Sequence, residues 1–192
     1  FAVATADEGI DLRKLKIIQQ ILIFDPIDKY QVNKFFKFDL IPTVFTNDHL
    51  NILLNEKKRL KSNKKILVHI KIDTGMNRLG VDYSEVIEFV LKVSANHNFV
   101  IDGIFTHFAT SDEAGSEYAK LQIKRFNDVI KSLKQRKMIK LMMNEKYIKV
   151  IMTIALKYFL YQNGEFWLST AQRKRKRSRL NWCLTGTGLI HF

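Results

Sequence analysis

The sequence predicts an α/β fold in which strands and helices alternate around a parallel sheet. Short apolar, β-branched runs alternate with longer stretches of helical period through the first 130 or so residues, and this alternation is typical of βα units. The spacing of the runs fits both a doubly wound sheet and a (β/α)8 barrel. In either fold the carboxyl ends of the strands carry the functional groups, so residues 73–80 and 107–113 are expected at the functional end.

Each element has its own signal. Strands are expected at 2–6, 20–24, 42–45, 65–72 and 99–108, where β-branched and aromatic residues gather, and helices at 8–16, at 28–38, after Thr46, after Ser84 and over 118–133. Thr46 and Ser84 are the expected N-caps, because a hydroxyl can accept a hydrogen bond from the first turn. The last two expected helices carry stripes of mostly apolar residues. The first stripe is Val86, Ile87, Val90 and Val93, and the second is Tyr118, Leu121, Arg125, Phe126, Val129 and Leu133.

The charge of the chain is concentrated in its last third. The formal net charge is +13, and residues 131–192 supply +12 of it. Four of the five methionines also lie beyond residue 135. We therefore expect a patterned segment over 1–135 and a divergent, irregular basic tail over 136–192, and we hypothesise that this tail is frameshifted or disordered.

Composition argues against several classes of protein. Cys183 is the single cysteine and cannot form an internal disulfide, and the first residues do not resemble a signal peptide. The most apolar run, 147–161, contains two lysines and is shorter than the roughly 20 apolar residues that a membrane-spanning helix needs. His49, His69, His97 and His191 show no metal-ligand spacing. We expect a cytoplasmic protein with no metal site and no membrane anchor.

The most informative segment is HIKIDTGMNRLGV, residues 69–81, a strand that runs into a polar loop with two glycines. It carries two cations, Lys71 and Arg78, and one carboxylate, Asp73. Taken alone, Lys71 and Asp73 could form a solvated pair, and His107, between two phenylalanines, could be a packed histidine. Gly75 and Gly80 are expected to allow a positive φ or a close approach of the backbone.

Four segments together resemble one family. HIKIDTGMNRLGV, GIFTHFATSDE (103–113), FAVATADEGIDLRK (1–14) and QIKRF (122–126) resemble, in order and spacing, the N-terminal barrel domain of alanine racemases over about residues 1–135. The resemblance implies a partial (β/α)8 TIM-type barrel and a homodimeric isomerase. It also implies interconversion of L-alanine and D-alanine through a pyridoxal 5'-phosphate imine, for peptidoglycan precursor synthesis.

The resemblance assigns roles to three residues. Arg78 matches an arginine that binds the phenolic oxygen of the cofactor and helps hold the substrate carboxylate, so it is both a catalytic and a cofactor-binding candidate. Lys71, the second catalytic candidate, matches a lysine that is carbamylated in many members and then orients that arginine. His107 matches a histidine near the cofactor ring and is a cofactor-binding candidate.

Other family motifs have no match. The lysine that forms the imine belongs to a motif that would precede Phe1, and Tyr147, Tyr158 and Tyr161 are not in the context of the second catalytic base. We therefore expect these 192 residues by themselves to be an inactive and poorly soluble fragment.

Two alternatives remain open from the sequence. The chain could derive from a serine or broad-specificity racemase. The basic run Arg173–Arg179, followed by Trp182, could bind nucleic acid, although we favour a solvated or mistranslated end.

Overall fold

The structure is a computed structural model that describes residues 1–110, 113, 115–136 and 150–152. Strands and helices alternate as expected. The elements are β1 (Ala2–Val3), α1 (Ala6–Lys14), β2 (Leu22–Pro26), α2 (Val32–Lys37), β3 (Ile41–Val44), α3 (Asn47–Arg59), β4 (Ile66–Asp73), β5 (Val81–Asp82), α4 (Val86–Ala95), β6 (Phe99–Thr106), α5 (Glu117–Gln135) and β7 (Val150–Met152).

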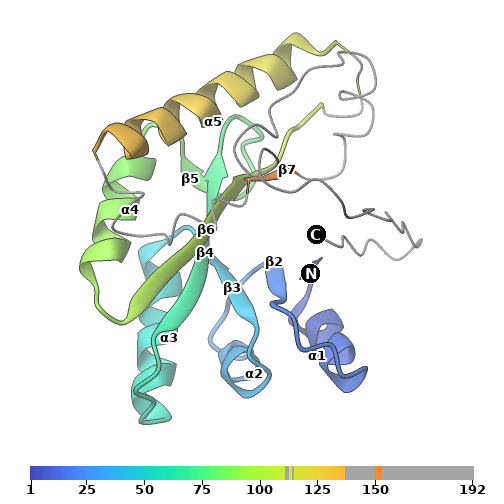
Figure 1. The fold of residues 1–192 in the computed structure, drawn as a ribbon, viewed down its shortest axis with the longest axis vertical. Helices are drawn as coiled ribbons and strands as arrows, with labels where there is room; N and C mark the ends of the chain where they lie inside the picture. The colour runs from blue at the N-terminus through green and yellow to red at the C-terminus, as the bar shows by residue number, and fades with distance from the viewer. Residues whose placement is uncertain (111–112, 114, 137–149, 153–192) are drawn as a thin grey trace, which may run out of the picture.

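The strand order distinguishes the two layouts that the sequence left open. The sheet runs β1-β2-β3-β4-β6-β7, every pairing in it is parallel, and the short β5 adds to β4. A doubly wound sheet would reverse its order at a switch point, whereas a barrel adds each strand beside the previous one. Figure 1 shows the strands as a curved row with the helices along its outer side. The described residues therefore form part of a (β/α)8 barrel wall.

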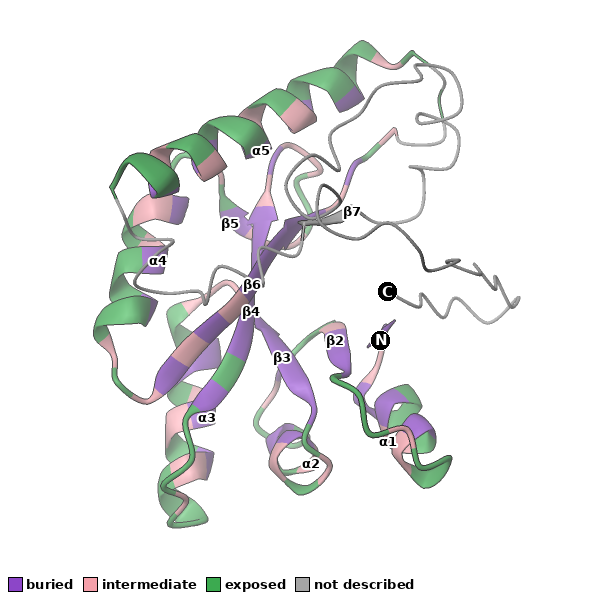
Figure 2. Cartoon of the chain, in the orientation of Figure 1, coloured by how far each residue is buried: buried purple, intermediate pink, exposed green. Residues whose placement is uncertain are grey.

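Alternation along the central strands divides their side chains between two faces. On β4, Ile66, Val68, Ile70 and Ile72 belong to the large core between the sheet and the helices. The residues between them face the inside of the curved sheet, where Ala2, Leu22, Ile41 and Phe105 form a much smaller buried cluster. Figure 2 shows the same arrangement: the strands are largely buried, and the helices expose the sides that face away from the sheet.

Helix starts follow local capping rules in most places. The Thr46 hydroxyl accepts a hydrogen bond from the His49 N–H at 3.2 Å, which confirms the expected cap of α3. The expectation for Ser84 is wrong, because α4 has Glu85 as its N-cap and that residue makes no side-chain cap. The Ser84 hydroxyl instead donates to the Asp82 carboxylate at 2.5 Å, because a hydrogen bond to a charged acceptor is stronger than one between neutral groups.

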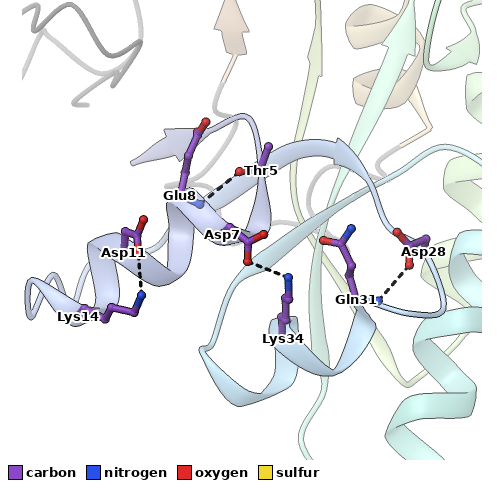
Figure 3. Close-up of polar contacts among 8 residues, drawn as sticks. All are labelled: Thr5, Asp7, Glu8, Asp11, Lys14, Asp28, Gln31 and Lys34. Atoms are coloured by element: carbon purple, nitrogen blue, oxygen red, sulfur yellow. Dashed lines mark hydrogen bonds and ion pairs between the residues drawn. The ribbon is translucent and has the colours of Figure 1, made fainter.

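Polar contacts also tie the first two helices together. The Thr5 hydroxyl accepts from the Glu8 N–H and caps α1, and Asp28 accepts from the Gln31 N–H at the start of α2 (Figure 3). Between the helices, Lys34 lies 2.7 Å from the Asp7 carboxylate. The caps define where each helix starts, and the Lys34–Asp7 ion pair is a polar contact between the two helices.

Helix α5 differs in part from its expected stripe. Phe126, Val129 and Leu133 are buried as predicted, but Tyr118 and Leu121 are each 39% exposed. Gln122 is fully buried instead. The start of α5 contacts the polar loops at the strand ends, so a polar residue occupies a position where an apolar stripe would continue.

Two further observations concern the described residues. Strand β7 pairs in parallel with β6 and corresponds to no strand expected from the sequence. None of the helices in the described ranges is long and apolar enough to cross a membrane.

Candidate active site at the carboxyl ends of β4 and β6

Lys71 lies on the inner face of β4, next to β6. Its register partner on β6 is Phe105, and its ammonium nitrogen lies 5.9 Å from the centre of that ring. Only 6% of the residue is exposed. Lys71 is therefore a buried amine, not half of a solvated pair with Asp73.

Asp73 organises the loop that follows β4. Its carboxylate accepts hydrogen bonds from the backbone N–H groups of Gly75, Asn77 and Arg78, at 2.8, 3.1 and 3.2 Å. One side chain thus holds the loop in a turn that begins and ends close to β4.

The two glycines of this loop have the conformations that the sequence led us to expect. The φ angles are +134° at Gly75 and +135° at Gly80. A Cβ atom at Gly80 would lie 2.5 Å from the backbone nitrogen of Asp73. Both positions therefore need glycine, and the tight return of the chain keeps Arg78 near the strand end.

Lys71, Arg78 and His107 lie close enough to influence one another's charge. Burial lowers the pKa of Lys71, and the Arg78 charge lowers it further, while Asp73 and Asp25 act in the opposite direction. Burial also lowers the pKa of His107 from 6.5, and the charges of Arg78 and Lys71 add to this effect. Both effects favour the neutral form of His107.

The chemistry of this cluster suits an anionic, planar ligand. A guanidinium presents a rigid fork of donors to a carboxylate or phenolate oxygen, and a neutral imidazole can donate or accept a hydrogen bond. Burial is the main cause of both lowered pKa values, and the nearby Arg78 charge adds to it, so an anion bound beside Arg78 would relieve repulsion between the cations.

Sequence reasoning missed two polar groups near this cluster. The first is Gln122, which bonds to Thr74 after β4 and to the His107 carbonyl oxygen after β6. The second is the pair formed by His69 Nε2 and the Asp102 carboxylate, 3.1 Å apart. Each was visible as a polar residue inside an otherwise apolar strand or stripe. No pattern indicated which partner each would find.

Several sequence candidates lie outside the described residues: Tyr147, Tyr158, Tyr161, Arg173–Arg179, Trp182, Cys183 and His191. Within the described ranges, no group of three or more His, Cys, Asp or Glu residues is placed to hold a metal ion.

Comparison with known proteins agrees with this geometry. The family model described as "Alanine racemase, N-terminal domain" matches residues 1–145. The alanine racemase of Carboxydothermus hydrogenoformans is 43% identical over 139 residues, which cover 71% of this chain and 36% of that protein. The alanine racemase of Halothermothrix orenii is 39% identical over 132 residues, which cover 69% of this chain and 34% of that protein.

Solved structures give the same result. The crystal structure of alanine racemase from E. faecalis has a TM-score of 0.62 and 37% identity, covering 68% of this chain and 35% of that one. Alanine racemase of Clostridium difficile 630 has a TM-score of 0.65 and 27% identity, covering 79% of this chain and 39% of that one. The chain thus spans little more than a third of the length of these relatives, and it belongs to the alanine racemase family, within the N-terminal TIM-barrel domain of that family.

Proposed function

We propose that this chain forms part of the active site of a racemase that interconverts L-alanine and D-alanine with pyridoxal 5'-phosphate. The observation that carries the proposal is the cluster of Lys71, Arg78 and His107 at the carboxyl ends of two adjacent barrel strands. The relatives named alanine racemase support the choice of substrate. A serine or broad-specificity racemase is the alternative within the same chemistry.

The cluster fits the cofactor through the charges of its donors. Pyridoxal phosphate, when bound, supplies an electron sink that acidifies the α-proton of an amino acid. Arg78 would hold the phenolic oxygen and the substrate carboxylate, because its fork of donors keeps its charge at all working pH values. His107, whose lowered pKa favours the neutral form, would hydrogen-bond near the ring without adding another charge.

Lys71 would act through Arg78. A buried amine with a lowered pKa spends more time unprotonated, and the unprotonated nitrogen can attack carbon dioxide. The nitrogen forms a bond to carbon and loses a proton, and the product is a carbamate anion. We propose that this anion orients the Arg78 guanidinium.

The test of ligand binding uses two matched arginine variants. We expect Arg78→Ala to weaken the binding of pyridoxal phosphate to the purified chain at least about tenfold, the loss expected for a charged hydrogen bond worth about 1.5–3 kcal/mol. Arg136→Ala removes the same charge from an exposed position after α5 and should leave the affinity unchanged. Equal affinity in the wild type and Arg78→Ala would contradict the assignment.

The activity of these 192 residues alone is tested separately. We propose that racemisation by this chain alone is negligible, because no residue in it matches the imine lysine or the second catalytic base of the family. Borohydride reduction with pyridoxal phosphate, followed by peptide mapping, should label no single lysine, and D-alanine should not accumulate from L-alanine. A single labelled lysine together with D-alanine formation would overturn this expectation.

A further inference from the structure

Gln122 on α5 is a fully buried amide whose hydrogen bonds reach two separate loops. Its Oε1 accepts a hydrogen bond from the Ala109 N–H at 2.9 Å. Its Nε2 donates to the Thr74 hydroxyl at 3.2 Å and to the His107 carbonyl oxygen at 3.3 Å. Both ends of the amide are therefore used, with the oxygen facing a donor and the nitrogen facing acceptors.

The two loops are those that carry the site. Thr74 begins the loop that contains Arg78, and His107 and Ala109 belong to the segment that leaves β6. A hydrogen bond of 2.8 Å between the hydroxyls of Thr74 and Thr106 continues the network across the two strand ends. Gln122 thus closes a bridge between the Arg78 loop and the His107 segment.

Two neighbours of Gln122 on α5 also bond to the Arg78 loop but not to the segment after β6, within the described residues. The Tyr118 hydroxyl donates to the Gly75 carbonyl oxygen at 2.5 Å, and Arg125 donates to the Thr74 carbonyl oxygen at 2.9 Å. With Gln122 they form one helical face, spaced by about one turn. Of these three, Gln122 is the residue that also bonds to the segment after β6, as far as the described part of the chain shows.

The chemistry of the position is specific to an amide of this length. Methionine has nearly the same shape but can neither donate nor accept at these points, so it would leave the Thr74 hydroxyl, the His107 carbonyl oxygen and the Ala109 N–H with fewer partners. Glutamate would place a charge in a fully buried position.

We propose that Gln122 is a positioning residue that sets the Arg78 loop against His107. The inference rests on the proposed function, which gives Arg78 and His107 their roles, but it is tested without the cofactor.

The test measures how strongly Arg78 influences His107. Among the described residues, two cations act on His107, Arg78 and the unmodified amine of Lys71, and both lower its pKa, so the titration is run without carbon dioxide. In the wild type, Arg78→Ala should therefore raise the His107 pKa, followed by NMR titration of the imidazole. In a Gln122→Met background the same substitution should produce a smaller rise, because the loop stays bonded to α5 but loses its bonds through the amide to the His107 segment. Gln135→Met, at the exposed end of α5, should leave the full rise intact.

Two outcomes would overturn the proposal. One is an equal effect of Arg78→Ala in the Gln122→Met and wild-type backgrounds, with circular dichroism showing that both are folded. The other is measured on the wild type by amide hydrogen exchange. The Ala109 amide should exchange as slowly as the core amides of β6. Fast exchange at Ala109 would show that its hydrogen bond to Gln122 is absent. A folded wild-type chain that does not bind pyridoxal phosphate would instead contradict the proposed function, and it would not affect the positioning role of Gln122.

Discussion

At the scale of single residues, Asp73 illustrates how one carboxylate shapes a functional loop. Its three backbone hydrogen bonds allow the chain to leave β4 and return to it at β5 within a few residues. Arg78 lies inside that turn, so its placement depends on Asp73 as much as on its own side chain.

Asp73→Ala should therefore loosen the loop and reduce stability. Removing a charged acceptor from three N–H groups should cost roughly 1–3 kcal/mol in the free energy of unfolding. Urea unfolding measures the loss, and faster exchange of the Gly75 amide would locate it. Asp128→Ala on the exposed face of α5 is the matched control and should have little effect. Unchanged exchange at Gly75 in Asp73→Ala would show that the carboxylate does not hold the loop.

Lys71 gives a prediction about pH. The pKa of the folded state is lower than the ordinary 10.5, so the unfolded chain binds more protons in the window between the lowered value and 10.5. The free energy of unfolding should therefore rise with pH through this window because of Lys71. Lys71→Met should remove that part of the rise, whereas Lys64→Met, at an exposed position, should keep it. Parallel pH profiles for all three proteins would argue that Lys71 is not buried as an amine.

At the scale of elements, Gly103 on β6 leaves room for the His69 ring of β4. His69 is the register partner of Gly103, and a Cβ atom at Gly103 would lie 2.4 Å from Cε1 of the His69 ring. The ring stays on the inner face, where its Nε2 reaches Asp102. A buried polar pair thus replaces apolar packing between the two central strands.

Gly103→Ala should be destabilising for this reason. Overpacking of a buried site typically costs about 1–3 kcal/mol. Combining it with His69→Ala should recover part of the loss, because the smaller side chain makes room for the new methyl group. Thermal unfolding of the two single variants and the double variant measures this coupling. Strict additivity of the two effects would rule out the proposed clash.

The helix caps offer a second comparison between elements. Thr46→Ala should cost about 1 kcal/mol, because Thr46 caps α3. Ser84→Ala should change the free energy of unfolding by less than about 0.5 kcal/mol, since the exposed Ser84 hydroxyl makes no cap. A larger loss at Ser84 than at Thr46, measured by urea unfolding, would contradict the capping assignment.

At the scale of the whole molecule, the two faces of the sheet are unequal. The outer face has a continuous core with the helices, while the inner face buries only a small cluster among the described residues. Leu67, the second residue of β4, is 37% exposed. Parallel sheets are normally covered on both faces, and a part of a barrel wall leaves its inner face without the strands that would cover it.

We therefore expect the purified chain to self-associate in a concentration-dependent way. Leu67→Lys should reduce association in size-exclusion chromatography, because a charge on this face disfavours contact between copies. Leu91→Lys, at a position 44% exposed on the outer side of α4, is the control and should change it less. A monomeric wild type with one cooperative thermal transition would show that the inner face is covered.

The division of the chain near residue 135 stays a prediction. The family match extends to residue 145, and residues 137–149 lie outside the described ranges.

The sequence by itself determined the alternation of strands and helices and the family. It also indicated the cap at Thr46 and the need for glycine at 75 and 80, because these depend on local patterns and on motifs that are contiguous in the chain. It did not identify Gln122 as a bridge, the pairing of His69 with Asp102, or the turn of Ser84 toward Asp82. The first two join segments far apart in the sequence, and the third depends on whether the hydroxyl accepts from a helix N–H or donates to a carboxylate. Only the folded chain decides such contacts, because a polar side chain excluded from water must bond to whichever donor or acceptor the packing brings within reach.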